Sequence, residues 1–585
     1  MNKRIVPVFV ASVIAVIALI ILAVGNMIEK NTPSKKQAGE EEINKLFLLY
    51  DGYTEDEKGF HFDNAVKAPD NQVAVILQNR LVRDRALIDE NGQIYLDVEF
   101  VQNSLNSRFY WDNNENILIY TTPTDVIKTE VGSMDYYVTK VKNTMNYVIV
   151  KTEGQKVYVA LDYVKQYSNI ETAFYETPNR LCITNQWDVT ADAAVIKSGD
   201  KVRVNDSIKS DILISYEEDM EAVILETVGK WSKIVTNDGY TGYIKTASLK
   251  NKTTKTYTSD FVEPEYTNIK KDFTISMAWH MVTNTTANNQ LVDLVTAAKG
   301  LNVISPTWFR LNDNEGNFSS LAQSEYVTRA HLIGLEVWAM IDDQSPDSDN
   351  KAIFPYTSKR ERLVNQLVAS AIEYNLDGIN IDFEYITADI AKDYVQFLRE
   401  LSVKCRINGI VLSIDDKVPE ASNLYYDRKE QGIIADYVIM MGYDEHWGEG
   451  SGAGSVASLP WVTAGIEKTL TEVPASKLIN AIPFYTRIWQ EDGAGNYVDS
   501  QAVDMQTAAD KLTANGTQAV WVDNVGQNYG EFSAGAQVYR IWLEDAKSIE
   551  EKMKLIRTYN LAGVSAWRLG YENPDIWNTI IKYTN

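Results

Sequence analysis

The chain has 585 residues, too many for one ordinary domain, and its 45% hydrophobic content is that of a folded globular protein. A formal net charge of -24 repels nucleic acid, so we expect no nucleic-acid partner. Cys182 and Cys405 are the only cysteines and lie far apart, which argues against a disulfide framework. With four histidines and no HExxH or CxxC pattern, the sequence predicts no metal site and no cofactor.

An uncharged apolar run covers residues 5–24 and follows Lys3 and Arg4. Its length matches the roughly 20 residues that a helix needs to cross a bilayer. The two basic residues favour the cytoplasmic side, which places everything after Met27 outside. We therefore expect residues 1–27 to be a single-pass transmembrane signal-anchor, with the bulk of the chain extracytoplasmic. A cleaved signal peptide is the alternative.

Two small β-rich domains are expected next. The polar residues 28–44 are predicted to be a linker. Residues 45–186 contain short alternating segments separated by Asn, Asp and Gly turns, which is typical of strands. This part resembles the small N-terminal domain of copper amine oxidases, a resemblance that implies no copper here. A second unit is predicted for residues 188–250, followed by a linker at 251–270.

The unit at 188–250 carries a specific pattern. Trp231 and Ile234 precede the run DGYTGYI at 238–244. The pattern resembles that of bacterial SH3-type domains, and the resemblance implies binding to the cell wall or a spacer role. The alternative is that Trp231 and Tyr243 only form the core of a small barrel.

From residue 271 to 585 the pattern changes, because strand-like runs alternate with helix-like runs. One helix is signalled by a predicted capping box from Ser358 to Glu361. Its apolar series follows at helical spacing: Leu363, Val364, Leu367, Val368, Ala371 and Ile372. Eight strand candidates predict an α/β fold, a TIM (β/α)8 barrel with one insertion. They are FTISMAWHM, NVISPTWFRL, LEVWAMIDD, GINIDFE, IVLSIDD, YVIMMGYDE, LINAIPFY and GVSAWRLG.

Acidic and aromatic residues gather at the ends of these strands, where the active sites of such barrels lie. The fourth strand alternates: Ile379, Ile381 and Phe383 point one way, and a polar row points the other. That row consists of Asn380, Asp382 and Glu384. Uncompensated buried charge is costly, so stability alone does not explain so many carboxylates at one rim. The alternative is a solvated strand face.

Three motifs carry a family resemblance. DGINIDFE resembles the D-G-x-D-x-D-x-E signature of glycoside hydrolase family 18, the chitinase-like enzymes. Met441 to Asp444 is similar to the family's M-x-Y-D element, and Trp567 matches the tryptophan that closes its sugar pocket. The segments IPFYTRIW and YRIWLEDAKSIEEKMKLI resemble the bacterial branch that contains spore-cortex and cell-wall N-acetylglucosaminidases.

The resemblance implies a mechanism in which the 2-acetamido group of the substrate is the nucleophile, an exception to the two-carboxylate rule. Glu384 is then the general acid, Asp382 orients the acetamido group, and Tyr443 donates its hydroxyl to the acetamido oxygen. The expected substrate-binding residues are Asn380, Met441, Asp444, Trp567, Tyr485 and Trp279. Asn380 departs from the family pattern, which has Asp there; we expect it to hydrogen-bond Asp382 and to shift the pH profile.

The sequence thus predicts a membrane-anchored, extracytoplasmic glycoside hydrolase of a bacterial, Gram-positive cell envelope. Its expected substrate is an N-acetylglucosamine-containing glycan, above all peptidoglycan, with the SH3-type domain holding the cell wall. One alternative is a catalytically inactive, chitolectin-like glycan-binding protein; another is a surface scaffold for partner proteins. Four residues of the insertion are expected either to line the cleft or to be structural: Trp521, Tyr529, Trp542 and Glu544.

Overall fold

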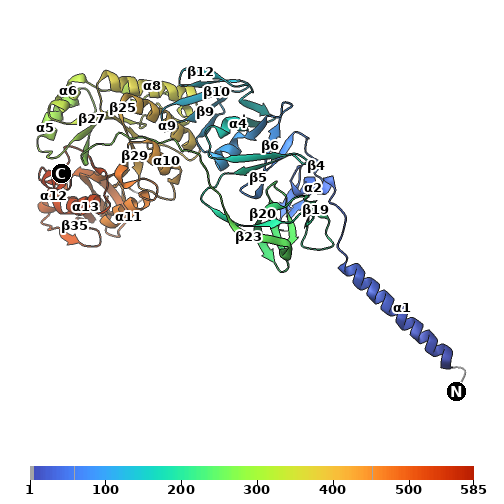
Figure 1. Cartoon of the computed structure of the whole chain (residues 1–585). Coiled ribbons are helices and arrows are strands. Elements are labelled where there is room, and N and C mark those ends of the chain that lie inside the picture. The colour runs from blue at the N-terminus through green and yellow to red at the C-terminus, as the bar shows by residue number, and fades with distance from the viewer. Residues whose placement is uncertain (1–4, 58, 449, 451, 585) are drawn as a thin grey trace. The chain divides into compact units, whose positions relative to one another are not determined.

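The computed structural model describes residues 5–57, 59–448, 450 and 452–584. The chain divides into two compact units (Figure 1). The first contains the described residues up to 109 together with 129–135 and 144–263. The second contains residues 110–128, 136–143 and the remainder from 264.

The N-terminal helix α1 (Ile5–Asn31) extends past the predicted limit at Met27. Within the described residues it is the one helix long and apolar enough to cross a membrane, with a mean hydropathy of 2.2 over its best window. A cleaved signal sequence would have the same length and composition, so the anchor stays a prediction. Lys3 and Arg4, on which the predicted orientation depends, lie outside the described residues.

The first unit is built on two seven-stranded sheets. One has the order β13-β14-β7-β6-β5-β16-β15, and the other β19-β18-β22-β21-β20-β17-β23. The strands of the first sheet are β5 (Gln72–Leu77), β6 (Arg80–Ile88), β7 (Ile94–Asp97), β13 (Val150–Glu153), β14 (Lys156–Ala160), β15 (Glu171–Tyr175) and β16 (Arg180–Thr184). The strands of the second are β17 (Thr190–Ile196), β18 (Lys201–Arg203), β19 (Ile212–Ser215), β20 (Met220–Val228), β21 (Trp231–Thr236), β22 (Thr241–Lys245) and β23 (Leu249–Thr256).

The second sheet bears on the predicted SH3-type unit. Strand β23 continues to Thr256, past the predicted boundary at residue 250. Trp231 and Tyr243 are half-buried, whereas Tyr240, between them, is buried in the core beside Ile234. The SH3-type assignment itself stays a prediction.

The second unit contains the predicted barrel, and all eight strands are confirmed. Their order is β24-β37-β31-β30-β29-β28-β27-β25, every neighbouring pair is parallel, and β24 pairs with β25 to close the ring. The strands are β24 (Ile275–His280), β25 (Val303–Leu311), β27 (Glu336–Asp342), β28 (Gly378–Asp382), β29 (Val411–Lys417), β30 (Tyr437–Met441), β31 (Leu478–Pro483) and β37 (Gly563–Trp567). A ninth strand, β26 (Phe318–Ser320), pairs antiparallel with β25.

Helices cover the outside of this ring (Figure 1). They are α5 (Leu291–Val295), α6 (Ser324–Leu332), α7 (Asn350–Ile353), α8 (Thr357–Glu373), α9 (Ala391–Asn408), α10 (Arg428–Ile434), α11 (Leu459–Thr469), α13 (Ala546–Thr558) and α14 (Ile576–Thr584). Ile379, Ile381 and Phe383 pack into the core beneath the helices, as the alternation of β28 predicts. Asn380 and Asp382 therefore belong to the inner face of the barrel.

The predicted insertion follows β31. It is a five-stranded antiparallel sheet, β33-β32-β36-β35-β34, with helix α12 (Met505–Ala514) packed on it. Its strands are β32 (Tyr485–Asp492), β33 (Tyr497–Asp504), β34 (Val520–Val522), β35 (Gln527–Ala534) and β36 (Gln537–Leu543).

The predicted capping box of α8 is wrong. The helix begins at Thr357, so Ser358 already lies inside it, and two carboxylates from elsewhere satisfy its first turn. Asp112 Oδ2 accepts hydrogen bonds from the backbone N–H and the hydroxyl of Thr357, and Glu115 Oε2 accepts one from the Ser358 N–H at 2.8 Å. Such acceptors stabilise a helix because its first N–H groups have no partner within it. The apolar series also ends one residue early, since Ile372 is 60% exposed.

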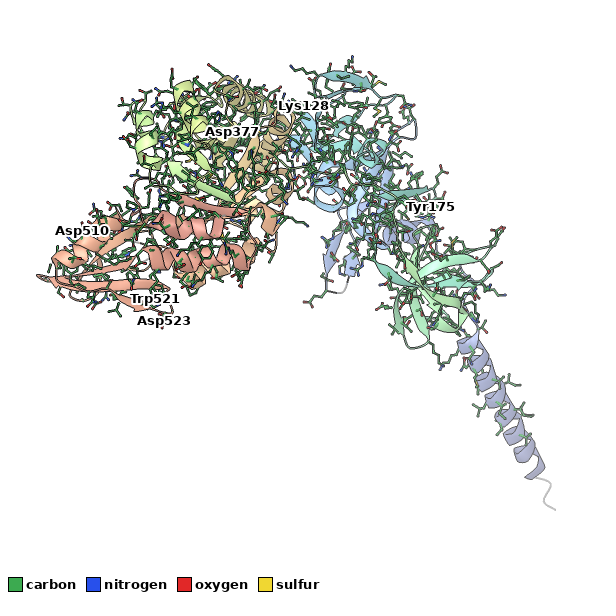
Figure 2. The ribbon with its side chains drawn as sticks, turned by 60° about the vertical axis from the view of Figure 1, so that its left-hand side comes forward. Lys128, Tyr175, Asp377, Asp510, Trp521 and Asp523 are labelled. Atoms are coloured by element: carbon green, nitrogen blue, oxygen red, sulfur yellow. The ribbon has the colours of Figure 1, made fainter. Side chains whose placement is uncertain are left out.

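Asp112 ends β8 (Phe109–Asp112), and Glu115 lies in the turn between β8 and β9 (Ile117–Thr121), which precedes β10 (Val126–Glu130). This segment makes further contacts with α8 and α9. The Tyr110 hydroxyl donates to Asp393, Gln396 donates to Thr121 at 3.1 Å, and Lys128 (labelled in Figure 2) forms an ion pair with Glu361 at 2.9 Å. Residues 110–128 thus pack with the barrel although they lie well upstream of residue 271.

Replacing the external cap tests this packing. We expect Asp112→Ala to lower the free energy of unfolding of the barrel by about 2 kcal/mol, because an N-cap contributes about 1 kcal/mol and Asp112 is buried while it accepts two bonds from the helix and two from its own turn. Urea denaturation followed by tryptophan fluorescence measures it. The matched control is Glu130→Ala, an exposed acid on β10. Equal midpoints for the two variants would contradict the capping role.

Candidate active site

A cavity of about 1030 Å³ lies at the C-terminal ends of the barrel strands. Strand alternation turns Asp382 inward at the last position of β28, and Glu384 follows two residues later on the adjoining loop. Seven of the nine predicted site residues line this cavity: Asp382, Glu384, Met441, Tyr443, Asp444, Tyr485 and Trp567.

Glu384 is held on both its backbone and its side chain. Its backbone N–H donates to Asp343 Oδ1 at 3.0 Å, and the N–H of Tyr385 donates to Asp343 Oδ2 at 2.9 Å. Gln344 Nε2 donates to Glu384 Oε1 at 3.2 Å, and Lys417 Nζ lies 3.4 Å from Oε2. The carboxyl group therefore faces the cavity from a fixed loop.

The sequence reasoning missed the supporting roles of Asp343, Gln344 and Lys417. Asp343 is buried, and burial raises the pKa of its carboxyl despite three N–H donors, the third being Asn350 Nδ2 at 2.6 Å. A signal was available, because Asp343 ends the third predicted strand and Lys417 directly follows the fifth. Their partners could not be read from the chain, since they come from other strands.

Asp382 is buried in a polar but anionic environment. Burial raises the pKa of its carboxyl well above the usual range, and the nearby Asp415 and Glu384 raise it further. Among the described residues, no group donates a hydrogen bond to Asp382 Oδ1. This carboxyl is therefore poised either to keep a proton or to accept a donor from a bound molecule.

Two predicted substrate contacts, Asn380 and Trp279, lie behind the wall of the cavity. Both are fully buried, and Trp279 Nε1 donates to Asn380 Oδ1 at 2.9 Å. The amide nitrogen of Asn380 donates to Asp415 Oδ1 at 2.8 Å and to Ser413 Oγ at 3.1 Å. The expectation that Asn380 bonds Asp382 is thus corrected: its amide is used by Asp415, on the next strand.

Aromatic side chains form the opposite wall. The rings of Tyr443 and Tyr485 meet edge to face with centroids 6.1 Å apart, and the Tyr485 hydroxyl donates to Asp444 Oδ1. Burial raises the pKa of Tyr443 well above its usual range, so its hydroxyl is a neutral donor. The ring of Trp567 lines the cavity and rests on Trp279, with centroids 5.9 Å apart.

The four aromatic and acidic residues of the insertion, which were expected either to line the cleft or to be structural, make contacts within the insertion and with α13. None belongs to the lining that the described residues give this cavity. Glu544 is buried against Lys552, with its oxygens 2.9 and 3.0 Å from Nζ, and Tyr529 packs on Trp542. Trp521 lies on the insertion (Figure 2), where Lys547 sits 3.6 Å from its ring centroid.

Comparison with known proteins gives the class of this chain. Residues 347–572 match the family model of glycosyl hydrolases family 18, and residues 76–183 match that of the copper amine oxidase N-terminal domain. The chain therefore carries a family 18 glycosyl hydrolase domain behind a copper amine oxidase N-terminal-like domain, and the barrel is that of a glycosidase. Both family resemblances are confirmed.

Individual relatives are more distant. The chain is 28% identical over 300 residues to the uncharacterized glycosylase YvbX of Bacillus subtilis, covering 48% of this chain and 85% of that protein. It is 28% identical over 270 residues to the cortical fragment-lytic enzyme of the same organism, covering 45% and 61%. The solved spore cortex-lytic enzyme SleL of Bacillus cereus is 18% identical with a TM-score of 0.49, covering 58% and 79%.

The anchoring of Glu384 gives a testable prediction. Because Asp343 holds two successive N–H groups at this loop, we expect Asp343→Ala to lower the free energy of unfolding by about 3 kcal/mol and the turnover rate by about 100-fold. Chemical denaturation and initial rates on an N-acetylglucosamine aryl glycoside measure the two effects.

The control is Asp347→Ala, which alters an exposed acid on the loop that contains Asp343. We expect both properties to stay near those of the unaltered protein. Full activity of the Asp343 variant would show that Glu384 needs no such anchor.

Proposed function

We propose that this protein is a membrane-anchored, extracytoplasmic glycoside hydrolase that cleaves N-acetylglucosamine linkages in peptidoglycan by substrate-assisted, retaining catalysis. The observation that carries the proposal is that Glu384, Asp382 and Tyr443 face one cavity at the rim of the barrel. The family 18 domain supports the reaction class. The likeness to a cortical fragment-lytic enzyme supports a cell-wall substrate.

In this mechanism Glu384 protonates the glycosidic oxygen as that bond breaks. The acetamido carbonyl oxygen of the substrate attacks the anomeric carbon, and the group becomes a cyclic oxazolinium ion. Asp382 accepts the acetamido N–H and offsets the positive charge, while Tyr443 donates its hydroxyl to the acetamido oxygen. The carboxylate of Glu384 then takes a proton from the water that opens the ring, which retains the configuration of the anomeric carbon.

The remaining cavity residues bind the sugar. Trp567 offers an apolar face to the ring, and Met441 adds apolar contact. Asp444, oriented by the Tyr485 hydroxyl, accepts hydrogen bonds from sugar hydroxyls. Gln344 and Lys417 fix the direction of Glu384.

The location is the second part of the proposal. Helix α1 would hold the protein in the membrane with both units outside, and the SH3-type domain would bind the cell wall. The length and apolar composition of α1 support the anchor. The net charge of -24 disfavours a peripheral association with anionic lipid, so the helix is the expected attachment.

The test is release of muropeptides from purified peptidoglycan by the full-length protein in detergent. We expect Glu384→Gln to reduce the rate by about 10² to 10⁴-fold, the usual contribution of general acid catalysis. Glu373→Gln, an exposed acid at the end of α8, is the matched control and should keep the rate. No release above that of the Glu384 variant would refute the proposal. Binding of N-acetylglucosamine oligomers without turnover would then favour the glycan-binding alternative.

A further inference from the structure

Two buried carboxyl groups stand side by side on neighbouring strands of the barrel. Parallel pairing of β28 with β29 aligns Asn380 with Ser413 and Ile381 with Ile414. Asp382 and Asp415 are the next residues on these two strands. Each lies two positions beyond an inward-facing residue, so both point to the inner face of the barrel. Asp382 is 7% exposed and Asp415 is 2% exposed.

Within the part of the chain that the structure describes, the titratable groups that interact with the two carboxyls are acids and phenols and offer no compensating positive charge. They are Glu384, Asp342, Asp343, Asp416, Tyr394 and Tyr443. Three nearby cations are already used. Lys417 is paired with Glu384, Arg310 forms a bidentate pair with Asp342, and the buried Arg428 lies 3.6 Å from Asp416. Two adjacent ionised carboxylates in this interior would be strongly destabilising.

The two acids differ in the hydrogen bonds that they accept from neutral groups. Asp415 Oδ1 accepts the amide of Asn380, and this donation favours its ionised form. Asp382 Oδ1 accepts no hydrogen bond from the described residues. Asn380 is itself held by Trp279, so the amide that Asp415 uses is fixed in direction. Without a ligand, the proton is therefore better placed on Asp382 and the charge on Asp415.

We propose that Asp415 is the proton partner of Asp382: the pair carries one proton, which moves from Asp382 to Asp415 when the acetamido group of the substrate binds. The O–H bond on Asp382 breaks and an O–H bond forms on Asp415, with no other acid or base involved. Asp382 is then ionised and accepts the acetamido N–H, while the total charge of the pair stays at one. This inference deepens the proposed function and rests on it. Asp415 is a positioning residue, since it lies behind the cavity wall.

The variant Asp415→Asn removes the second proton site at constant size. In this variant the proton on Asp382 must leave for solvent before the substrate can be bound productively. We expect the acid limb of the kcat/KM profile to move to higher pH by about one unit, which is a loss of about tenfold at the pH of the original limb. A role in packing alone would lower kcat/KM equally at all pH values, and that result would overturn the proposal.

A swap and a control sharpen this experiment. The double variant Asn380→Asp with Asp415→Asn places an acid on the inner face again, this time on β28. We expect the acid limb of this variant to return to its original pH. Ser413→Ala removes the other acceptor of the Asn380 amide without changing any charge. The acid limb of the pH profile of Ser413→Ala should stay at its original pH. Failure of the swap, or the same shift in Ser413→Ala, counts against proton sharing.

A second readout does not depend on activity. When folding raises the pKa of a carboxyl group, the folded state favours the protonated form. The protein then loses stability as the pH rises from the pKa of the unfolded state to the pKa of the folded state. Asp415→Asn removes the neighbouring charge that helps to raise the pKa of Asp382, so this loss of stability becomes smaller in the variant. We expect its Tm relative to the unaltered protein to increase steadily from pH 4 to pH 8. A Tm difference independent of pH would overturn the shared proton. An inactive protein with the pH-dependent difference would instead refute only the proposed function.

Discussion

Closure of eight parallel strands puts every second residue of each strand into an interior that water does not reach. Most of those positions in this barrel are apolar, for example Met277, Trp338 and Ile439. Some polar ones have fixed partners, as Asn380 has in Trp279 and Asp415. Asp382 is the charged case: among the described residues no group donates to its Oδ1 atom, and burying a carboxylate in this way is costly for folding. That cost is understandable if a ligand supplies the missing hydrogen bond, as a catalytic site requires.

A second consequence is that the loop carrying Glu384 must be held by residues from outside the strand that precedes it. Beyond Asp382 the chain leaves the sheet, and Glu384 has no ladder partner. Asp343, directly after the third strand, accepts its N–H, while Lys417 of the fifth strand contacts its carbonyl and its carboxyl. The site is therefore a product of three neighbouring strands. The same logic applies to α8, whose first turn depends on Asp112 and Glu115.

The sequence was informative wherever the signal was local. The alternation of GINIDFE fixed which side of the strand each residue takes, and eight apolar runs were enough to predict the barrel. What it could not supply were partners across the fold. Asn380 was expected to bond Asp382, two residues away, but strand pairing brings Asp415 closer to its amide. Trp279 was expected at the sugar, but it lies beneath Asn380. The cap of α8 failed as a prediction because its carboxylates lie more than 240 residues upstream.

The central claim is that the acetamido group of the substrate, oriented by Asp382, is the nucleophile. The most direct measurement is the rate on aryl N-acetylglucosaminides whose acetamido group carries one, two or three fluorine atoms, together with NMR of the first anomer released. Substrate assistance predicts a steep fall in kcat as fluorine weakens the amide oxygen, with the β-anomer appearing first. A rate insensitive to fluorination, or release of the α-anomer, would contradict the account.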